Sequence, residues 1–294
     1  MICKSILVRK EQEIISLILH FASKIDSIRA VTLEGSRVNP NIKQDIFCDY
    51  DISFFLDRQS IYDFQNSNDE WLKVFGNLVM LQKPESMELY PPDLNGWFSY
   101  LMLFDDGVRI DLKLIPVEDM PFYKDSEKLM RVLLDKDNFF SPLNDPSDSA
   151  FFIKPLTKQS FLDCCNDFYW LYVCVSKDIL RCEVLLANAH LNMMREGIFI
   201  LLSWHIALKQ RNFEFSLGKE YKFLPHFLSK AQTKKLYSCF NLGNKKQAKK
   251  TLKVLEKFFA QNARGIIDLY FRNTFCSLPY RKEALSYVKI LKNM

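Results

Sequence analysis

The hydrophobic pattern of this 294-residue chain changes at the segment 141–155, and this change limits the folds that are open to it. The segment holds three prolines among Ser, Asn and Asp residues, which is typical of an exposed connection. Short β-type runs and helical patterns are mixed before it, whereas almost every stretch after it has the helical period. We therefore predict an α+β protein of two domains: a small mixed sheet with helices in residues 1–140, followed by a helical bundle in residues 141–294.

The first part combines one helical pattern with several β-type runs. Apolar residues recur with the helical period over residues 10–26, and β-type runs follow at 29–33 and 49–56. Two further runs, 97–104 and 108–115, flank an Asp-Gly step that predicts a hairpin. The expected order is helix, strand, strand, helical insert and hairpin. In the second part, where glycine is nearly absent, we expect helices at about 158–178, 181–209, 220–240, 245–272 and 280–292.

Composition excludes several classes of protein. With 48% hydrophobic residues the chain can bury a full core, so it is neither disordered nor fibrous. No segment approaches the roughly 20 uninterrupted apolar residues of a membrane span, and the N-terminal residues lack the pattern of a signal peptide. We expect a soluble, cytoplasmic protein that binds no membrane.

The cysteines indicate reduced thiols. They show no CxxC pair and no Cys/His quartet at zinc spacing, so we expect no structural zinc. In a chain of this length without a secretion signal, mostly buried free thiols are the expected form. The eight cysteines are Cys3, Cys48, Cys164, Cys165, Cys174, Cys182, Cys239 and Cys276.

The net charge of +5 is unevenly distributed. Residues 45–106 contain twelve Asp and Glu against three Lys and Arg, and residues 209–264 contain fourteen Lys and Arg against three Glu. This asymmetry suits a cleft that receives a cationic substrate on one side and polyphosphate on the other. Most of these charges belong to solvated faces, so the asymmetry supports a site hypothesis but does not create one.

The most informative motif is Gly35-Ser36, a spacer of twelve residues and then Asp49-Tyr50-Asp51. Two carboxylates two apart on a strand point to the same face, because side chains alternate along the strand. Like charges held so close repel unless a divalent cation lies between them and nucleotide phosphates. Gly35 allows close backbone approach, and the backbone amides and hydroxyl at Ser36 can bind phosphate oxygens.

Asp111 is the candidate third carboxylate. In Arg109-Ile110-Asp111-Leu112-Lys113-Leu114 the apolar residues form a buried face, so Asp111 points outward with Arg109 and Lys113, on a strand that can pair beside the Asp49 strand. Three such carboxylates predict a two-metal nucleotidyltransferase site. Solvated strand carboxylates and an unrelated calcium site remain the alternatives at this point.

Longer segments of the sequence resemble one protein family. LEGSR and DYDISFF look like the nucleotidyltransferase signature of the polymerase-β-like superfamily, and the rest of the chain is similar to the bacterial aminoglycoside (streptomycin) 6-adenylyltransferases. The similar runs are MLQKPESMELYPP (80–92), WFSYLMLFDDG (97–107), RIDLKLIP (109–116), VLLDKDN (132–138), KPL (154–156), FLDCCNDFYW (161–170) and GKEYKFL (218–224).

This resemblance implies transfer of AMP from MgATP to an aminoglycoside hydroxyl, most plausibly of streptomycin, with release of pyrophosphate and resistance to the antibiotic. It also implies that Asp49, Asp51 and Asp111 hold Mg²⁺, with Asp111 as the base that takes the proton of the attacking hydroxyl. Ser36 and Arg37 would contact the triphosphate. The family usually has Asp-His where this chain has Ala189-His190, and a small polar residue at Lys113, which puts the identity of the aminoglycoside in question.

Weaker candidates lie outside the carboxylates. Glu88 could bind a cationic group of the substrate, although an exposed loop acid fits as well. Glu183 and His190, two turns apart on one face of a helix, could line the acceptor pocket. Lys219 and Lys222 could hold the β- and γ-phosphates, or be ordinary surface lysines. We expect the helical domain to close over substrate and nucleotide.

Two other functions remain open. The same chemistry could act on a protein or RNA acceptor, as in toxin–antitoxin systems, or the chain could be a catalytically silent binding protein. A basic stripe at helical spacing slightly favours an RNA acceptor, but it lacks aromatic interleaving, so we expect a solvated face and no nucleic-acid partner. We expect a monomer. The basic stripe consists of Lys246, Lys249, Lys250, Lys253 and Lys257.

Overall fold

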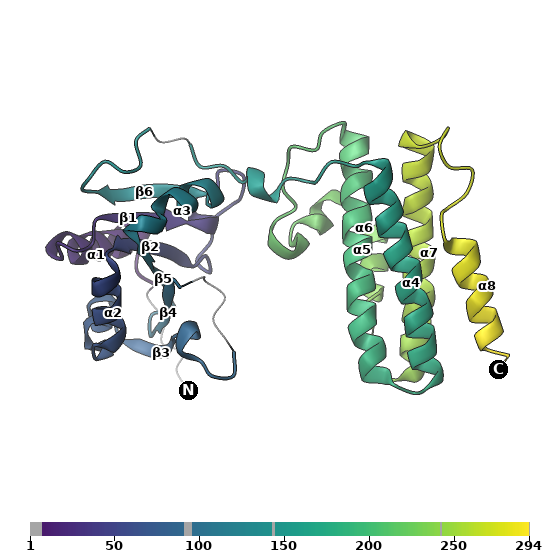
Figure 1. Ribbon diagram of the computed structural model, residues 1–294, viewed down its shortest axis with the longest axis horizontal. Coiled ribbons are helices and arrows are strands. Elements are labelled where there is room, and N and C mark those ends of the chain that lie inside the picture. Colours follow the sequence, from purple (N-terminus) through teal and green to yellow (C-terminus); the bar gives the residue numbers. More distant parts are fainter. Residues whose placement is uncertain (1–7, 91–95, 143–144, 242, 294) are drawn as a thin grey trace. The chain divides into compact units, whose positions relative to one another are not determined.

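The computed structural model describes residues 8–90, 96–142, 145–241 and 243–293. The chain divides into two compact units, Met1–Ala150 and Phe151–Met294. The first unit is a sheet with helices and the second is a bundle of helices (Figure 1). The prediction of an α+β fold is confirmed.

A six-stranded mixed sheet with the strand order β3-β4-β5-β2-β1-β6 forms the centre of the first unit. The neighbours β2 and β5 are parallel and all other pairs are antiparallel. The strands are β1 (Ala30–Glu34), β2 (Tyr50–Leu56), β3 (Leu78–Gln82), β4 (Phe98–Phe104), β5 (Arg109–Pro116) and β6 (Met130–Asp135). The edge strands β3 and β6 were not predicted from the sequence.

The two faces of this sheet are built differently. One face is wholly apolar, with Tyr50, Ile52 and Phe54 buried against helix α1 (Glu11–Lys24) as their alternation predicts. Helix α2 (Arg58–Asn66) and the 3₁₀ turn η2 (Asp69–Phe75) also pack on this face. On the opposite face, helix α3 (Met120–Ser126) covers a small second core, and polar side chains occupy the rest. The short 3₁₀ turns η1 (Gly35–Val38), η3 (Pro84–Ser86) and η4 (Val117–Asp119) connect these elements, and η5 (Ser149–Phe151) follows β6.

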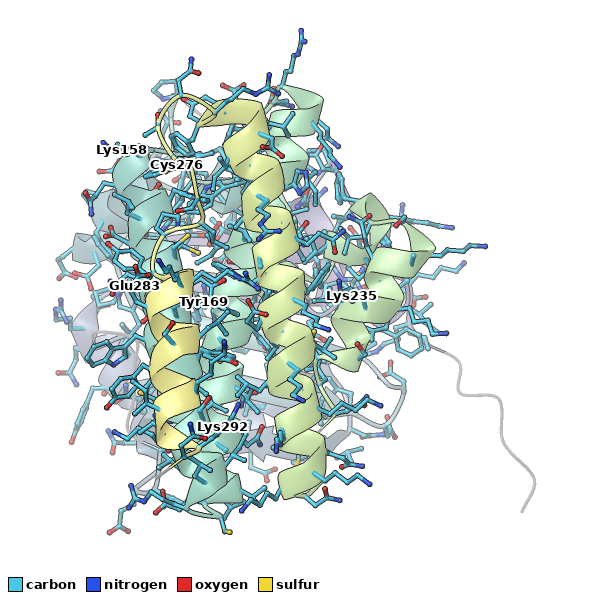
Figure 2. The ribbon with its side chains drawn as sticks, turned by 90° about the vertical axis from the view of Figure 1, so that its right-hand side faces the viewer. Lys158, Tyr169, Lys235, Cys276, Glu283 and Lys292 are labelled. Atoms are coloured by element: carbon cyan, nitrogen blue, oxygen red, sulfur yellow. The ribbon has the colours of Figure 1, made fainter. Side chains whose placement is uncertain are left out.

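The second unit is built on three long helices. Helices α4 (Lys158–Leu180), α5 (Val184–Gln210) and α7 (Lys245–Tyr270) pack together, and the shorter α8 (Arg281–Leu291) lies against α4 (Figure 1). Phe168 of α4 stacks on Phe259 of α7 with ring centroids 3.7 Å apart. Figure 2 looks onto α7 and α8, with Tyr169 between them and Lys235 on the neighbouring α6 (Lys230–Ser238).

One predicted helix, 220–240, is wrong. Gly218, Glu220 and Tyr221 have positive φ angles, so the chain turns in η6 (Lys219–Tyr221) and again in η7 (Leu224–Phe227). The α-helix begins only after Ser229, whose hydroxyl accepts from the backbone N–H of Gln232. The other four predicted helices of this half are confirmed within a few residues.

The seven cysteines among the described residues are free thiols, and Cys3 lies outside those residues. Only Cys165 and Cys239 are fully buried, so the expectation of mostly buried thiols was too strong. None of the helices in the described part of the chain is long and apolar enough to cross a membrane.

Candidate active site on the sheet of the first unit

Four acidic side chains gather on the polar face of the sheet. Glu34 of β1 is paired with Asp51 of β2, and Asp51 is paired with Asp111 of β5. Directly paired residues point to the same face, and Asp49 lies two positions before Asp51. The predicted pairing of the Asp111 strand beside the Asp49 strand is confirmed. We call Glu34, Asp49, Asp51 and Asp111 the carboxylate row.

Asp51 is the acid whose protonation is most strongly perturbed. Burial, followed by the charges of Glu34 and Asp111, raises its pKa to about 6. Burial also raises the pKa of Asp49, against the opposing attraction of Arg109. At Asp51 burial and the neighbouring acids both disfavour the charged form, and a cation bound beside it would favour that form.

Gly35 makes room for the Asp51 carboxylate. It has φ +69°, which an L-residue rarely adopts, and a Cβ at this position would collide with the carboxylate of Asp51. Its backbone N–H donates to the carbonyl of Leu129 at 3.0 Å. The close approach predicted for Gly35 is therefore made, in this structure, to a side chain of the row.

Glu34 is a buried charge that sequence reasoning missed. It is 2% exposed, and its carboxylate accepts hydrogen bonds from the hydroxyls of Thr32, Ser53 and Tyr123. The same carboxylate forms an ion pair with Lys113. Burial lowers the pKa of Lys113, but the charge and hydrogen bond of Glu34 outweigh it, so that this pKa is raised. Lys113 lies on the same face of the sheet, two positions after Asp111, and is thus a fixed cation beside the row.

A second cation, Arg109, lies between two of the predicted metal ligands. Its Nε and Nη2 donate to the two carboxylate oxygens of Asp111 at 2.8 and 2.7 Å. The same Nε is 3.7 Å from Oδ2 of Asp49. In the described residues, no three Asp, Glu, His or Cys side chains converge closely enough to hold a metal ion. In this structure the guanidinium of Arg109 partly neutralises the negative charge of Asp49 and Asp111.

Arg37 organises the approach to Asp49. Its guanidinium donates to the carbonyls of Asp49 at 3.1 Å and Cys48 at 2.6 Å and to Glu11 at 3.2 Å. It also lies over the ring of Tyr50, 3.6 Å from the centroid. Arg37 therefore fixes the segment that carries Asp49, and its contact with the triphosphate stays a prediction. Ser36 is half-buried in η1, between Gly35 and Arg37.

The QKPE segment holds a second acid, Glu85, which contacts the sheet. Glu85 accepts from the backbone N–H and hydroxyl of Ser99 at 2.8–2.9 Å, and Ser99 is paired with Lys113 in the sheet. Glu88 is exposed in the segment that follows η3. The strand alternation of β4 and β5 would have pointed to Ser99, but the partner of Ser99 could not be read from the sequence.

The remaining candidates belong to the second unit. Nδ1 of His190 on α5 is 2.7 Å from Oδ2 of Asp178 on α4, which is 4% exposed. Glu183 is the N-cap residue of α5, and its Oε1 lies 2.8 Å from Nη2 of Arg181. Lys219 and Lys222 are exposed at the turns that interrupt the predicted helix. The lysines of the basic stripe on α7 are exposed as expected.

Two surface cavities lie along α3, and the lining of the smaller one includes Met130, which is paired with Glu34 of the row. They have volumes of about 280 and 490 Å³, and both include Lys124 in their lining. Neither lining includes Asp49, Asp51 or Asp111. These cavities are therefore not the candidate site.

A Gly-Ser turn followed by carboxylates on neighbouring strands of a mixed sheet defines a nucleotidyltransferase, and comparison with known proteins gives the family. Residues 8–276 match the family model of streptomycin adenylyltransferase. An aminoglycoside 6-adenylyltransferase of Bacillus subtilis (strain 168) is 41% identical over 88% of this chain and 91% of its own length. Its namesake from Staphylococcus aureus is 38% identical over 85% of this chain and 88% of its own length. A crystal structure of an aminoglycoside 6-adenyltransferase from Bacillus subtilis aligns over 96% of this chain and 98% of that chain, with 35% identity and a TM-score of 0.46.

The chain therefore belongs to the streptomycin adenylyltransferase family. The resemblance read from the sequence and the prediction of an adenylyltransferase enzyme are confirmed. Membership implies ATP as the co-substrate.

Proposed function

We propose that the protein transfers AMP from MgATP to a hydroxyl of an aminoglycoside, with streptomycin as the preferred acceptor, and so confers resistance. The observation that carries this proposal is the carboxylate row, in which Asp51 and Asp111 are paired on adjacent strands, Asp49 directly precedes β2, and Gly35 leaves space for Asp51. The names of the similar proteins support the acceptor class.

The donor chemistry of the row fits Mg²⁺, and to bind it the three aspartate side chains would have to draw closer together than they lie in this structure. Its donors are carboxylate oxygens, which this ion prefers. Burial and the neighbouring acids raise the pKa of Asp51 to about 6, so a divalent cation would relieve charge that the protein alone leaves uncompensated. Asp49, Asp51 and Asp111 would hold the metal. When bound, Mg²⁺ supplies neutralisation of the charge that develops on the phosphates during displacement.

The reaction is a displacement at the α-phosphorus of ATP. The acceptor oxygen forms a bond to this phosphorus while the bond to the bridging oxygen of pyrophosphate breaks, and pyrophosphate leaves with the electron pair. Asp111 takes the proton of the acceptor hydroxyl. Gly35 and Arg37 act indirectly, because Gly35 leaves space for Asp51 and Arg37 fixes the segment before β2. Ser36, which lies in η1, would donate to a phosphate oxygen.

The helical unit is proposed to bind the acceptor and the outer phosphates. The carboxylate of Asp178 is hydrogen-bonded to Nδ1 of His190. We therefore propose that the other ring nitrogen, Nε2, contacts the ligand. Glu183 offers a carboxylate oxygen that is buried and has no partner among the described residues. Lys219 and Lys222 are exposed cations suited to phosphate. We propose that the protein acts in the cytoplasm as a monomer.

The proposal is tested by incubating the purified protein with ATP labelled in the α-phosphate and a panel of acceptors. The panel contains streptomycin, 4,6-disubstituted aminoglycosides, a mixture of proteins, and tRNA. We expect label on streptomycin, little on the other aminoglycosides, and none with the Asp51→Asn variant. Label on protein or tRNA alone would support the alternative acceptor that the exposed basic stripe on α7 favours.

A further inference from the structure

Arg109 contacts two acids of the carboxylate row, Asp49 and Asp111, whereas Lys113 is paired with Glu34. It is the first residue of β5 and points to the same face as Asp111, two positions on. Its fork donates to both oxygens of Asp111, and its Nε lies 3.7 Å from Asp49, which precedes another strand. The guanidinium thus bridges two side chains that the proposed function assigns to metal.

The two cations of the row differ in how firmly they are held. Lys113 is paired with Glu34, whose side chain is 3% exposed, and the pair is embedded among hydroxyl donors. Arg109 has a side-chain exposure of 40% and Asp49 one of 39%. An exposed ion pair is weak and is readily exchanged, whereas breaking a buried one leaves an uncompensated charge. Arg109 is therefore held less firmly than Lys113, because its guanidinium is partly exposed, although its forked pair with Asp111, which is 19% exposed, is the stronger of its two contacts.

A guanidinium and a divalent cation compete for the same oxygens here. While each oxygen of Asp111 accepts one hydrogen bond from Arg109, one lone pair of each is engaged, and the positive charge of the guanidinium repels a metal ion that approaches the remaining lone pairs. When Arg109 withdraws, both oxygens become available, and the unpaired charges of Asp49 and Asp111 attract a cation.

We propose that Arg109 is a placeholder cation, which holds Asp49 and Asp111 in position in the metal-free protein and is displaced when a divalent cation binds. This inference rests on the proposed function, since it takes the row as the metal site. Arg109 is then a positioning residue whose presence weakens metal binding. Its release couples the arrival of the metal to the freeing of Asp111.

The test measures binding of Mn²⁺ alone to the full-length protein, by electron paramagnetic resonance of the free ion, without nucleotide or antibiotic. Arg109→Met should bind Mn²⁺ roughly fivefold more tightly than the wild type, a factor that corresponds to an exposed ion pair at the upper end of its usual strength. Arg109→Lys, which keeps the charge but loses the fork, should fall between the two. Arg58→Met is the matched control, because Arg58 makes an exposed pair with Asp119 at 3.4 Å outside the row, and its affinity should equal that of the wild type.

Asp51→Asn separates the two possible failures. If Arg109→Met binds Mn²⁺ no more tightly than the wild type while Asp51→Asn binds it far more weakly, the metal site stands and the placeholder role is wrong. If wild type, Arg109→Met and Asp51→Asn all bind equally, or none binds, the row is not a metal site and both proposals are overturned. Circular dichroism of each variant establishes that the fold is retained, and Arg109→Lys serves as the second variant should Arg109→Met not fold.

Discussion

Replacing Lys113 with Met removes the cation from a buried ion pair and leaves its partner in place. Glu34 then keeps three hydroxyl donors but has no counter-ion, while its side chain is 3% exposed. Removing one partner of a buried pair costs about 3–5 kcal/mol, and the remaining donors favour the lower end, so we expect a loss of about 3 kcal/mol. For a unit of about 150 residues this corresponds to a fall in Tm of roughly 6–12 °C.

The double variant Glu34→Gln/Lys113→Met shows whether the cause is the stranded charge. It removes both charges and keeps similar volumes, so its stability should lie within about 1 kcal/mol of the wild type. Lys73→Met is the matched control, because Lys73 pairs with Glu70 while 65% exposed and should change stability by less than about 0.5 kcal/mol. Differential scanning calorimetry of the full chain measures all four proteins. A double variant as unstable as Lys113→Met would refute the role of the buried charge.

Three further changes test the carboxylate row. Asp49→Asn and Asp51→Asn should each reduce adenylyl transfer by about a hundredfold or more with little change in Tm, and turnover above roughly a tenth of wild type would contradict their assignment. Because burial and the neighbouring acids raise the pKa of Asp51 to about 6, the metal-free folded protein retains a proton that the unfolded chain loses near pH 4. The contribution of Asp51 to stability should therefore fall as the pH rises from about 4 to about 6, so in urea titrations over this range the wild type should lose stability relative to Asp51→Asn. Gly35→Ala should cost about 1–2 kcal/mol for its φ of +69° and should also impair transfer, because the new Cβ displaces the Asp51 carboxylate; unimpaired turnover would count against this.

Much of the sheet could be predicted because its local patterns agree with its tertiary contacts. Residues 49–54 alternate polar and apolar side chains, and the structure buries Tyr50, Ile52 and Phe54 as this alternation requires. The hairpin around Gly107 and the outward face of Asp111 followed from the same period. The edge strands β3 and β6 were missed, because β3 has no buried residue and so carries no clear alternation.

The contacts that complete the site depend on residues far apart in the sequence. Glu34 is buried because Tyr123 and Lys113 reach it from other elements, 89 and 79 residues away. Likewise, Arg37, which fixes the Asp49 segment, is itself hydrogen-bonded to Glu11, and no local sequence pattern predicts that partner. Sequence reasoning therefore found the residues suited to metal and phosphate but not the cations and hydrogen bonds that position them.

The helix predicted over 220–240 failed for a local reason that the sequence did contain. Gly218 adopts a positive φ angle, and Pro225 has no backbone N–H to donate within a helix. The helical period of the apolar residues concealed both signals. Ser229 with Gln232 three residues later marks the true start, as a capping box.

The central claim, that the row transfers AMP to an aminoglycoside, is tested most directly by mass spectrometry of streptomycin after incubation with ATP, Mg²⁺ and the purified protein. We predict that streptomycin gains the mass of one AMP group, that pyrophosphate is released in equal amount, and that Asp49→Asn and Asp51→Asn leave streptomycin unmodified. Unchanged streptomycin with the wild-type protein would contradict the acceptor, and full modification by either variant would contradict the site.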